Sequence, residues 1–384
     1  MKRVLLGDVV QINPLTKLSK GQFVKFISMD KLDPFTKTPN GYEKRKFSSG
    51  AKFTNGDTLL ARITPCLENG KTAFVDFLDD LEVAAGSTEF VILRNIEGLT
   101  DPAYIYYLSI SPAFRDYAIK SMVGTSGRQR VQNDVLAKME LSLPPLYQQK
   151  KIADILSSLD EKIELNRRMN ETLEQLGQAL FRHYFVDNSE VDSWESGEVS
   201  DVVRIYSGFA FKSKDFDIDG RYGLVTIKNV QDGSFIKDCT DHLSEPLPDK
   251  TPEHVHLKSG DIILSLTGNV GRVCAVVGRD YLLNQRVAKL VSDESQAYVY
   301  FLFRSKTMKD RMVGISKGTA QKNLSPIETG KLKIKIPPTN IMSQFEESAM
   351  DLLDMIVSNN EQIQTLISLR DSLLPKLISG EIEV

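Results

Sequence analysis

The chain repeats one succession of motifs. The sequence YIYYL at residues 104–108 returns as YVYFL at 298–302, the Gly-Thr step at 124–125 returns at 318–319, and the Pro-Pro step at 144–145 returns at 337–338. A period near 190 residues is far too long for a solenoid unit and has the size of a whole domain plus a connector. We therefore expect two similar lobes and two similar helices on one polypeptide.

Each Pro-Pro step opens a long stretch with coiled-coil spacing, in which apolar and amide residues recur at alternating steps of four and three. The expected helix-pairing positions are Ile152, Leu156, Leu159, Ile163, Asn166 and Leu173 in the first stretch and Leu352, Ile356, Asn359, Ile363, Leu366 and Leu373 in the second. Because each helix follows its own lobe, antiparallel pairing within one chain is the favoured arrangement. Periodicity alone leaves open an ordinary dimerisation coiled coil.

The lobes combine short strand-like runs with turn signals. A Gly-Asp step at 56–57 precedes a run of β-forming residues, and the Gly-Asp step at 260–261 does the same in the second half. Equivalent residues are separated by 204 positions at these turns, by 194 at the Gly-Thr loops and by 193 throughout the helical stretches. Insertions therefore fall inside the lobes, whereas the helices keep one register.

These patterns predict an α+β fold. It consists of two lobes with curved antiparallel sheets, separated by two long helices that pair as an antiparallel coiled coil, with a pseudo-twofold internal repeat. The expected boundaries are 1–145 for the first lobe, 146–189 for the central helical spacer, 190–337 for the second lobe and 338–384 for the distal helical spacer.

Charge is distributed unevenly over these parts. The net charge of the whole chain is -3, yet the first lobe carries +3 and the second +1, while the central and distal spacers carry -1 and -6. Local patches decide phosphate binding, so the overall charge does not exclude nucleic acid. No apolar run is long enough to span a bilayer, and the start of the chain is too polar for a signal peptide. We expect a cytoplasmic protein that is not associated with a membrane.

Residues that commonly hold metals are sparse. Three isolated cysteines, Cys66, Cys239 and Cys274, lack Cys-x-x-Cys pairing, which fits a reducing compartment and argues against a disulfide framework or a zinc site. His254 and His256 could share one strand face as metal ligands. Without a nearby cysteine or carboxylate pattern, solvent-facing polar residues are the favoured interpretation.

Motifs for catalysis are broken. An amino-methyltransferase needs (Asp/Asn)-Pro-Pro-(Tyr/Phe), whereas residues 101–104 read DPAY, and Asp101-Pro102 is better interpreted as the N-cap and first residue of a helix. Residues 70–72 resemble the end of a P-loop, but Pro65 stands where the first glycine is required. We therefore expect no catalytic residue, no metal site and no cofactor in this chain.

The ordered, duplicated motifs resemble the DNA-specificity (S) subunit of type I restriction-modification enzymes over essentially the whole chain. The residues that carry the resemblance are the Gly-Asp turns and Gly-Thr loops already named, Gly7-Asp8-Val9, Leu143-Pro144-Pro145 with Gln148-Gln149-Lys150, Ile336-Pro337-Pro338 with Gln344, and the tail at 374–382. Each motif is weak alone, and their order and duplication are specific.

The resemblance implies a non-catalytic subunit in which each lobe is a target-recognition domain. Its expected partners are double-stranded DNA with a bipartite site and a fixed gap, two methyltransferase (M) subunits and restriction/translocase (R) subunits. Adenine-N6 methylation and endonuclease activity are then expected in those partners, together with S-adenosylmethionine, ATP and Mg. The outward helix faces near Arg167, Arg168, Glu346 and Glu347 are the expected contact with M.

Two classes of loop in each lobe carry side chains that suit DNA bases and phosphates. The Gly-Thr loops supply Thr125, Ser126, Arg128, Gln129 and Arg130 in the first lobe and Lys317, Thr319, Gln321, Lys322 and Asn323 in the second. The turns after the central strands supply Arg62, Thr64, Asn69 and Lys71, matched by Thr267, Asn269 and Arg272. A predicted helix upstream in the second lobe adds the charges of Arg304, Lys306, Lys309 and Arg311. Any one of them alone is more often a solvated surface residue, so the prediction concerns the loops as sets.

Two other classes of function remain open at this point. The chain could be a coiled-coil protein-interaction scaffold, or part of a fused restriction-methylation enzyme. The broken motifs disfavour the enzyme. A gel-shift experiment, with and without an M subunit, separates the scaffold from the DNA-recognition subunit.

Overall fold

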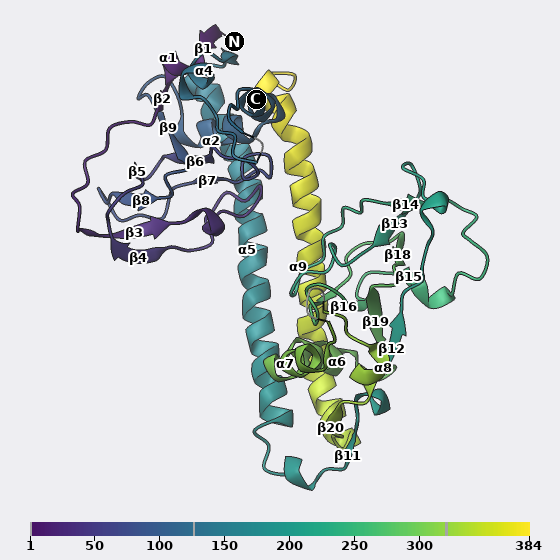
Figure 1. The fold of residues 1–384 in the computed structure, drawn as a ribbon. Coiled ribbons are helices and arrows are strands. Elements are labelled where there is room, and N and C mark those ends of the chain that lie inside the picture. The colour runs from purple at the N-terminus through teal and green to yellow at the C-terminus, as the bar shows by residue number, and fades with distance from the viewer. Residues whose placement is uncertain (1, 126, 319–321) are drawn as a thin grey trace. The chain divides into compact units, whose positions relative to one another are not determined.

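The structure is a computed structural model that describes residues 2–125, 127–318 and 322–384. The chain divides into two compact units (Figure 1): unit 1 comprises residues 1–164 and 365–384, and unit 2 comprises residues 165–364. Each unit contains one lobe together with a part of both long helices. Ser126, Thr319 and Gln321, three of the residues predicted to contact DNA, lie outside the described residues.

Short strands and helices build the lobe of unit 1. The strands are β1 (Lys2–Leu5), β2 (Val10–Ile12), β3 (Phe23–Ile27), β4 (Glu43–Lys46), β5 (Ala51–Phe53), β6 (Thr58–Ala61), β7 (Thr72–Phe74), β8 (Ala84–Gly86), β9 (Phe90–Asn95) and β10 (Glu140–Leu143). The helices are α1 (Leu6–Val9), α2 (Pro102–Ile110), α3 (Pro112–Lys120) and α4 (Asn133–Ala137), and α5 (Leu146–Phe185) follows.

The lobe of unit 2 repeats this succession. Its strands are β11 (Ser196–Glu198), β12 (Arg204–Ser207), β13 (Tyr222–Val225), β14 (His242–Leu243), β15 (His256–Leu257), β16 (Ile262–Ser265), β17 (Val273–Ala275), β18 (Tyr281–Leu283), β19 (Val287–Val291) and β20 (Lys333–Lys335). Its helices are α6 (Gln296–Arg304), α7 (Lys306–Ile315) and α8 (Pro326–Gly330), and α9 (Thr339–Ser379) follows.

The two lobes share one sheet topology. The strand order β2-β9-β6-β7 of unit 1 returns as β12-β19-β16-β17 in unit 2, and β4-β3-β8-β5 returns as β14-β13-β18-β15. A two-stranded ribbon, β1-β10 or β11-β20, leads into each long helix. The expected internal repeat is therefore confirmed.

The sheets differ from the expectation in one respect. Strands β3 and β8 pair in parallel, as do β13 and β18, so these sheets are mixed rather than wholly antiparallel. Parallel neighbours need a long crossover connection. Here the residues between β3 and β8, and between β13 and β18, form several intervening strands and provide it. The sequence pattern of short strands does not distinguish the two kinds of pairing.

The Gly-Asp dipeptide occurs at the equivalent turn of both units for a physical reason. Gly56 and Gly260 adopt φ of +86°, a conformation that favours glycine. The carboxylate of Asp57 accepts the amide N–H of Thr54 at 2.8 Å and binds Arg94 at 2.6 Å. In unit 2, Asp261 likewise accepts the amide N–H of Lys258 at 2.8 Å and binds Lys289 at 2.7 Å. Each buried aspartate thus closes its own turn and fixes it to a neighbouring strand.

The two long helices are confirmed at 40 residues for α5 and 41 for α9. Their segments run antiparallel. In unit 2, Asn166 of α5 contacts Gln362 of α9 and Asn170 contacts Ile356, so residue numbers rise along one helix as they fall along the other. In unit 1, Asp160 of α5 contacts Arg370 of α9. No helix in the part of the chain that the structure describes is both long and apolar enough to cross a membrane.

A buried ion pair joins the helices in unit 1. The carboxylate of Asp160 lies 2.7 Å from Arg370, and their side chains are only 6% and 4% exposed. Arg370 also donates to the carbonyl oxygen of Phe35 at 3.2 Å, and the Tyr107 hydroxyl donates to Asp160 at 2.7 Å. Burial alone would lower the pKa of Arg370, but the negative charges of Asp160 and Asp371 outweigh it and raise that pKa. The network ties both helices to the lobe.

In unit 2 the position equivalent to Arg370 is occupied by a glycine, so no ion pair can form there. A shift of 193 residues relates Arg370 to Gly177 of α5, and a Cβ on Gly177 would lie 2.1 Å from the ring of Phe301. Phe301 of α6 therefore packs directly on the helix backbone. Tyr107, which is equivalent to Phe301, instead carries the hydroxyl that binds Asp160. Equivalent positions of the two long helices are thus stabilised by a salt bridge in unit 1 and by aromatic packing in unit 2.

Side-chain amides form a polar ladder between the helices of unit 2. Asn166 is fully buried and donates to Gln362 at 3.2 Å, and Asn359 donates to the side-chain oxygen of Asn170 at 2.9 Å. Asn170 in turn donates to Asn360 at 3.0 Å. Asn166 and Asn359 therefore do not meet each other. Buried amides of this kind specify helix register at some cost in stability.

The predicted apolar pairing positions lie at or beside the cores. Ile152 and Leu156 are buried in the core of unit 1, and Ile356 is buried in the core of unit 2. Ile163 and Ile363 are buried elsewhere along the helices. Leu173, Leu352 and Leu373 are partly buried against the cores, and Leu159 and Leu366 are half-buried. Their neighbours Leu353 and Leu374 are buried more deeply. The buried face of α9 therefore includes residues beside the heptad positions.

Replacing Arg370 tests the buried pair. Arg370→Ala should lower the free energy of unfolding by about 3–5 kcal/mol, because Asp160 would remain buried without its charge partner. The matched control is Lys376→Ala on the same helix, where the side chain is exposed and the expected change is within about 0.5 kcal/mol. Chemical denaturation measures both. Equal, small losses for the two variants would contradict the assigned role of the pair.

Candidate nucleic-acid interface

The two predicted loop classes of unit 1 form one surface. The amide N–H of Thr64 donates to the carbonyl oxygen of Gln129 at 3.0 Å, and that of Val131 donates to Arg62 at 2.9 Å. Val123 and Arg130 are joined by two backbone hydrogen bonds of 3.0 Å across the Gly-Thr loop. We call residues 62–71 and 123–131 the platform of unit 1. The sequence places these segments about 60 residues apart, and the backbone bonds them side by side.

Unit 2 builds its platform with the same hydrogen bonds. The amide N–H of Gly268 donates to Lys322 at 3.2 Å, and that of Leu324 donates to Leu266 at 2.8 Å. Lys317 and Asn323 exchange backbone hydrogen bonds of 2.9 and 2.7 Å. Residues 266–272 and the described residues of 317–324 form the platform of unit 2. Every bonded residue is offset from its counterpart in unit 1 by the repeat spacing found in the sequence.

Several predicted side chains of the unit 1 platform are bound within the protein. Arg130 forms an ion pair with Glu89 at 2.7 Å, and hydrogen bonding to Arg130 lowers the pKa of Glu89. Arg62 donates to the carbonyl oxygen of Val131 at 3.1 Å, and the Thr64 hydroxyl donates to the Glu68 carboxylate at 3.0 Å. These side chains stabilise the platform.

Other predicted side chains of unit 1 point to solvent. Thr125, Arg128 and Asn69 are exposed, and Gln129 is half-buried. Among the residues that the structure describes, no side-chain partner is found for Arg128. Arg128 is therefore the cation of this platform that is most accessible to a phosphate or a base.

The unit 2 platform presents a similar division. Thr267 is buried, whereas Asn269, Lys317, Lys322 and Asn323 are exposed. Over the described residues, neither Lys317 nor Lys322 has a carboxylate partner. Their charge is available to an external anion.

Lys71 and Arg272 are equivalent residues with equivalent contacts. Each follows a glycine and offers its carbonyl oxygen to the central strand, Lys71 to Ala61 at 3.1 Å and Arg272 to Ser265 at 2.9 Å. The Lys71 ammonium donates to the carbonyl oxygen of Met29 at 3.0 Å. Arg272 donates to the side-chain oxygen of Gln231 at 2.5 Å. Each cation thus ties the turn after the central strand to a third loop, which contains Met29 in unit 1 and Gln231 in unit 2. The sequence did not predict this loop as part of the surface.

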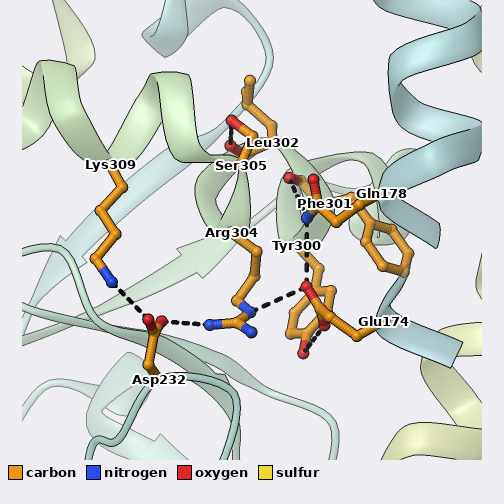
Figure 2. A network of polar contacts seen from close by, with 9 residues as sticks. All are labelled: Glu174, Gln178, Asp232, Tyr300, Phe301, Leu302, Arg304, Ser305 and Lys309. Atoms are coloured by element: carbon orange, nitrogen blue, oxygen red, sulfur yellow. Dashed lines mark hydrogen bonds and ion pairs between the residues drawn. The ribbon is translucent and has the colours of Figure 1, made fainter. Parts of the chain in front are cut away.

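The third loop of unit 2 also accounts for two cations on the α6–α7 segment (Figure 2). Asp232 binds Arg304 and Lys309, and Arg304 binds Glu174 of α5 at 3.2 Å. The side chain of Arg304 is only 14% exposed. Burial lowers its pKa, but the nearby carboxylates outweigh burial and raise it. Arg304 and Lys309, which were expected to add charge to this lobe, are therefore both paired with carboxylates within it.

The same cluster anchors the lobe to the long helix. The Tyr300 hydroxyl donates to Glu174 at 3.0 Å, and burial together with that carboxylate raises the pKa of Tyr300 well above its usual value. Gln178 of α5 donates to the carbonyl oxygen of Phe301 at 3.1 Å (Figure 2). Of the remaining cations, Arg311 donates to the carbonyl oxygen of Lys333, and Lys306 is exposed. Whether a cation of this segment is paired therefore depends on carboxylates that are distant from it in sequence.

Residues with possible catalytic or metal-binding roles have structural contacts. The Asp101 carboxylate accepts the amide N–H of Tyr104 at 2.9 Å, with Pro102 at the first helical position, so its interpretation as an N-cap is confirmed. His254 stacks on Tyr206, and its Nε2 lies 3.0 Å from the carbonyl oxygen of Ser207. The described residues contain no group of three histidines, cysteines or carboxylates that could hold a metal.

Comparison with known proteins identifies the family. The sequence model of the family Type I restriction modification DNA specificity domain matches residues 1–175 and residues 191–367. The two matches cover most of the chain and fall one on each repeat. The chain belongs to this family. It is a DNA-recognition subunit of a type I restriction-modification system and not the catalytic one.

Individual relatives agree with this assignment. The chain is 26% identical to the Type I restriction enzyme HindI specificity subunit of Haemophilus influenzae, over 85% of this chain and 86% of the relative. It is 28% identical to the MjaIX specificity subunit of Methanocaldococcus jannaschii, over 73% of this chain and 69% of the relative. The type I S subunit from M. genitalium has the same fold, with a TM-score of 0.55, 15% identity and coverage of 98% and 96%.

Two substitutions test the platforms as DNA-binding surfaces. Arg128→Ala in unit 1 and Lys322→Ala in unit 2 should each weaken binding to the cognate DNA, because each removes an exposed cation without a carboxylate partner among the described residues. A contact to phosphate would lower the salt dependence of the affinity by about 1 unit of slope, and a contact to a base would relax the sequence preference at that base. Binding titrations at several salt concentrations distinguish the two.

The control for these variants is Lys138→Ala, which removes an exposed cation of the same lobe outside the platform. It should leave both affinity and salt slope unchanged. If neither platform variant alters affinity at any salt concentration, the platforms are not the DNA-binding surfaces.

Proposed function

We propose that the chain reads a split DNA sequence, with the platform of unit 1 on one half-site and the platform of unit 2 on the other. The observation that carries the proposal is the equivalence of the platforms. Their backbones are joined by the same hydrogen bonds, while their exposed side chains differ, Arg128 and Asn69 in one and Lys322 and Asn323 in the other. One scaffold with two sets of polar side chains suits the recognition of two different base sequences.

The helices are proposed to set the length of the gap between the half-sites. Support comes from their invariant repeat spacing of 193 residues, whereas spacing within the lobes drifts to 204. The buried Asp160–Arg370 pair and the amide ladder oppose sliding of one helix along the other. A helix pair whose register is fixed within each unit is suited to be a spacer.

Two M subunits are proposed to bind the chain through the helices, and R subunits join that assembly. The repeat supports two M subunits, because it supplies two related helix segments. Glu346 is not available for this contact, since its carboxylate accepts the amide N–H groups of Ala297 and Tyr298 at 2.7 and 3.1 Å at the start of α6. The expected contact is therefore reduced to the surroundings of Arg167, Arg168 and Glu347. S-adenosylmethionine, ATP and Mg belong to the partner subunits in this proposal.

Lengthening both helices by one heptad tests the spacer. If the insertions were placed at positions related by the repeat, they would lie between Leu159 and Asn166 and between Leu352 and Asn359. The contacts between the antiparallel helices require another place for the insertion in α9. Because Asp160 pairs with Arg370 and Asn166 with Gln362, an insertion between residues 160 and 166 must be matched by one between residues 362 and 370.

Seven residues add about 10 Å of helix, so the gap in the preferred DNA should grow by about 3 base pairs with both half-sites unchanged. Selection of bound sequences from a random DNA pool, with the M subunit present, measures gap and half-sites together. An insertion in α5 alone is the control and should impair binding, because one of the two contacts must break. An unchanged gap in the double insertion would show that the helices do not set it.

A further inference from the structure

The basic charge of unit 1 is concentrated in one segment outside its platform. Residues 17–52 contain nine Lys and Arg against three Asp and Glu, a net charge of +6, although residues 1–145 together carry only +3. The equivalent segment of unit 2, residues 210–256, contains six against nine, a net charge of -3. The two lobes share this part of the fold but not its charge.

The basic segment contributes strands β3, β4 and most of β5 to the sheet β4-β3-β8-β5, in which β4 is an edge strand (Figure 1). All four residues of β4 are exposed, and three of them, Lys44, Arg45 and Lys46, are basic. Phe23, which lies opposite Lys46 on β3, is 73% exposed. An exposed strand with three successive cations beside an exposed aromatic ring forms a compact binding surface, which we call the basic ribbon.

The cations of this ribbon are not neutralised by the protein. In the described part of the chain, Lys44, Arg45 and Lys46 have no carboxylate partner. The guanidinium of Arg45 lies 3.2 Å from the ring centre of Phe26, and Lys46 lies 5.6 Å from that of Phe23. These rings hold the cations in place without cancelling their charge.

A neighbouring cation, Lys25, is by contrast neutralised by carboxylates. Lys25, on the adjacent strand β3, binds Glu82 at 2.7 Å and Asp79 at 3.2 Å, and its side chain is only 11% exposed. In the equivalent region of unit 2, charged side chains are also paired within the protein. There Arg221 binds Asp280 at 2.9 Å, and the Tyr222 hydroxyl donates to Glu245.

Lysines on an edge strand also protect a sheet against pairing with another chain. That role requires charge only on the edge itself. In unit 1 the excess continues beyond the edge strands, to Lys17 and Lys20 on the loop before β3. Protection of one edge therefore does not account for the whole basic segment.

We infer that the basic ribbon of unit 1 is a second DNA-binding surface, which contacts the phosphate backbone beside the half-site read by the platform, and that unit 2 has no counterpart. The inference rests on the DNA-recognition function of the chain. Phosphate contacts of this kind add affinity and fix orientation without reading sequence. The predicted footprint on DNA is therefore asymmetric, with additional protected phosphates next to the half-site of unit 1.

Removal of the three charges tests the ribbon in the full chain with its M subunit. The variant Lys44→Gln/Arg45→Gln/Lys46→Gln should lower the slope of log affinity against log salt by about 2–3, since each phosphate contact contributes about 0.9. The half-site sequences should not change. Hydroxyl-radical footprinting should show loss of protection only beside the half-site that responds to Arg128→Ala.

The matched control removes three exposed lysines from the equivalent segment of unit 2, Lys212→Gln/Lys214→Gln/Lys250→Gln. Its slope and footprint should equal those of the unmodified chain. The single variants Lys44→Gln and Lys46→Gln, each expected to lower the slope by about 1, serve if the triple variant does not fold.

Each other outcome overturns the inference. Equal slopes for the ribbon variant and the unmodified chain, even with increased aggregation, would show that the cations only protect the edge. Equal losses in the ribbon variant and the unit 2 control would show a general charge effect. If the unmodified chain failed to bind any DNA sequence selectively, the recognition function itself would fail, which is a distinguishable result.

Discussion

Antiparallel pairing of α5 and α9 through buried polar groups is the constraint on which the rest of the structure depends. In unit 1 the pairing is fixed by Asp160 and Arg370, and in unit 2 by the amides of Asn166, Asn170 and Asn359. Apolar residues would tolerate sliding by a heptad, whereas a buried charge or amide has one acceptable partner. The cost in stability is compensated by a unique register, and each lobe is tied to that register by side chains such as Tyr107, whose hydroxyl binds Asp160.

Recognition surfaces in this protein are assembled by backbone bonding between loops. Each platform joins the turn after the central strand to the Gly-Thr loop through the same hydrogen bonds in both units. The backbone therefore carries the side chains without depending on their identity. Substitutions at exposed positions can change the recognised DNA while the surface that presents them is preserved. The charge difference between residues 17–52 and 210–256 shows the same independence farther from the platforms.

The sequence was sufficient for whatever depends on local spacing or on the repeat. The two long helices, the Gly-Asp turns and the N-cap at Asp101 all follow from residues close together in the chain. Contacts between distant residues could not be predicted in this way. The ion pairs of Arg304 with Glu174 and Asp232, and of Arg130 with Glu89, which is 41 residues away, join residues that are far apart in sequence. The parallel strand pairs were missed for the same reason.

The most direct test of split recognition is methylome sequencing of cells that carry this chain with its M subunit, compared with cells that lack only this chain. The account predicts one N6-methyladenine motif that depends on the chain and consists of two specified half-sites separated by a fixed number of unspecified bases. A continuous motif, or two half-sites at variable separation, would contradict it.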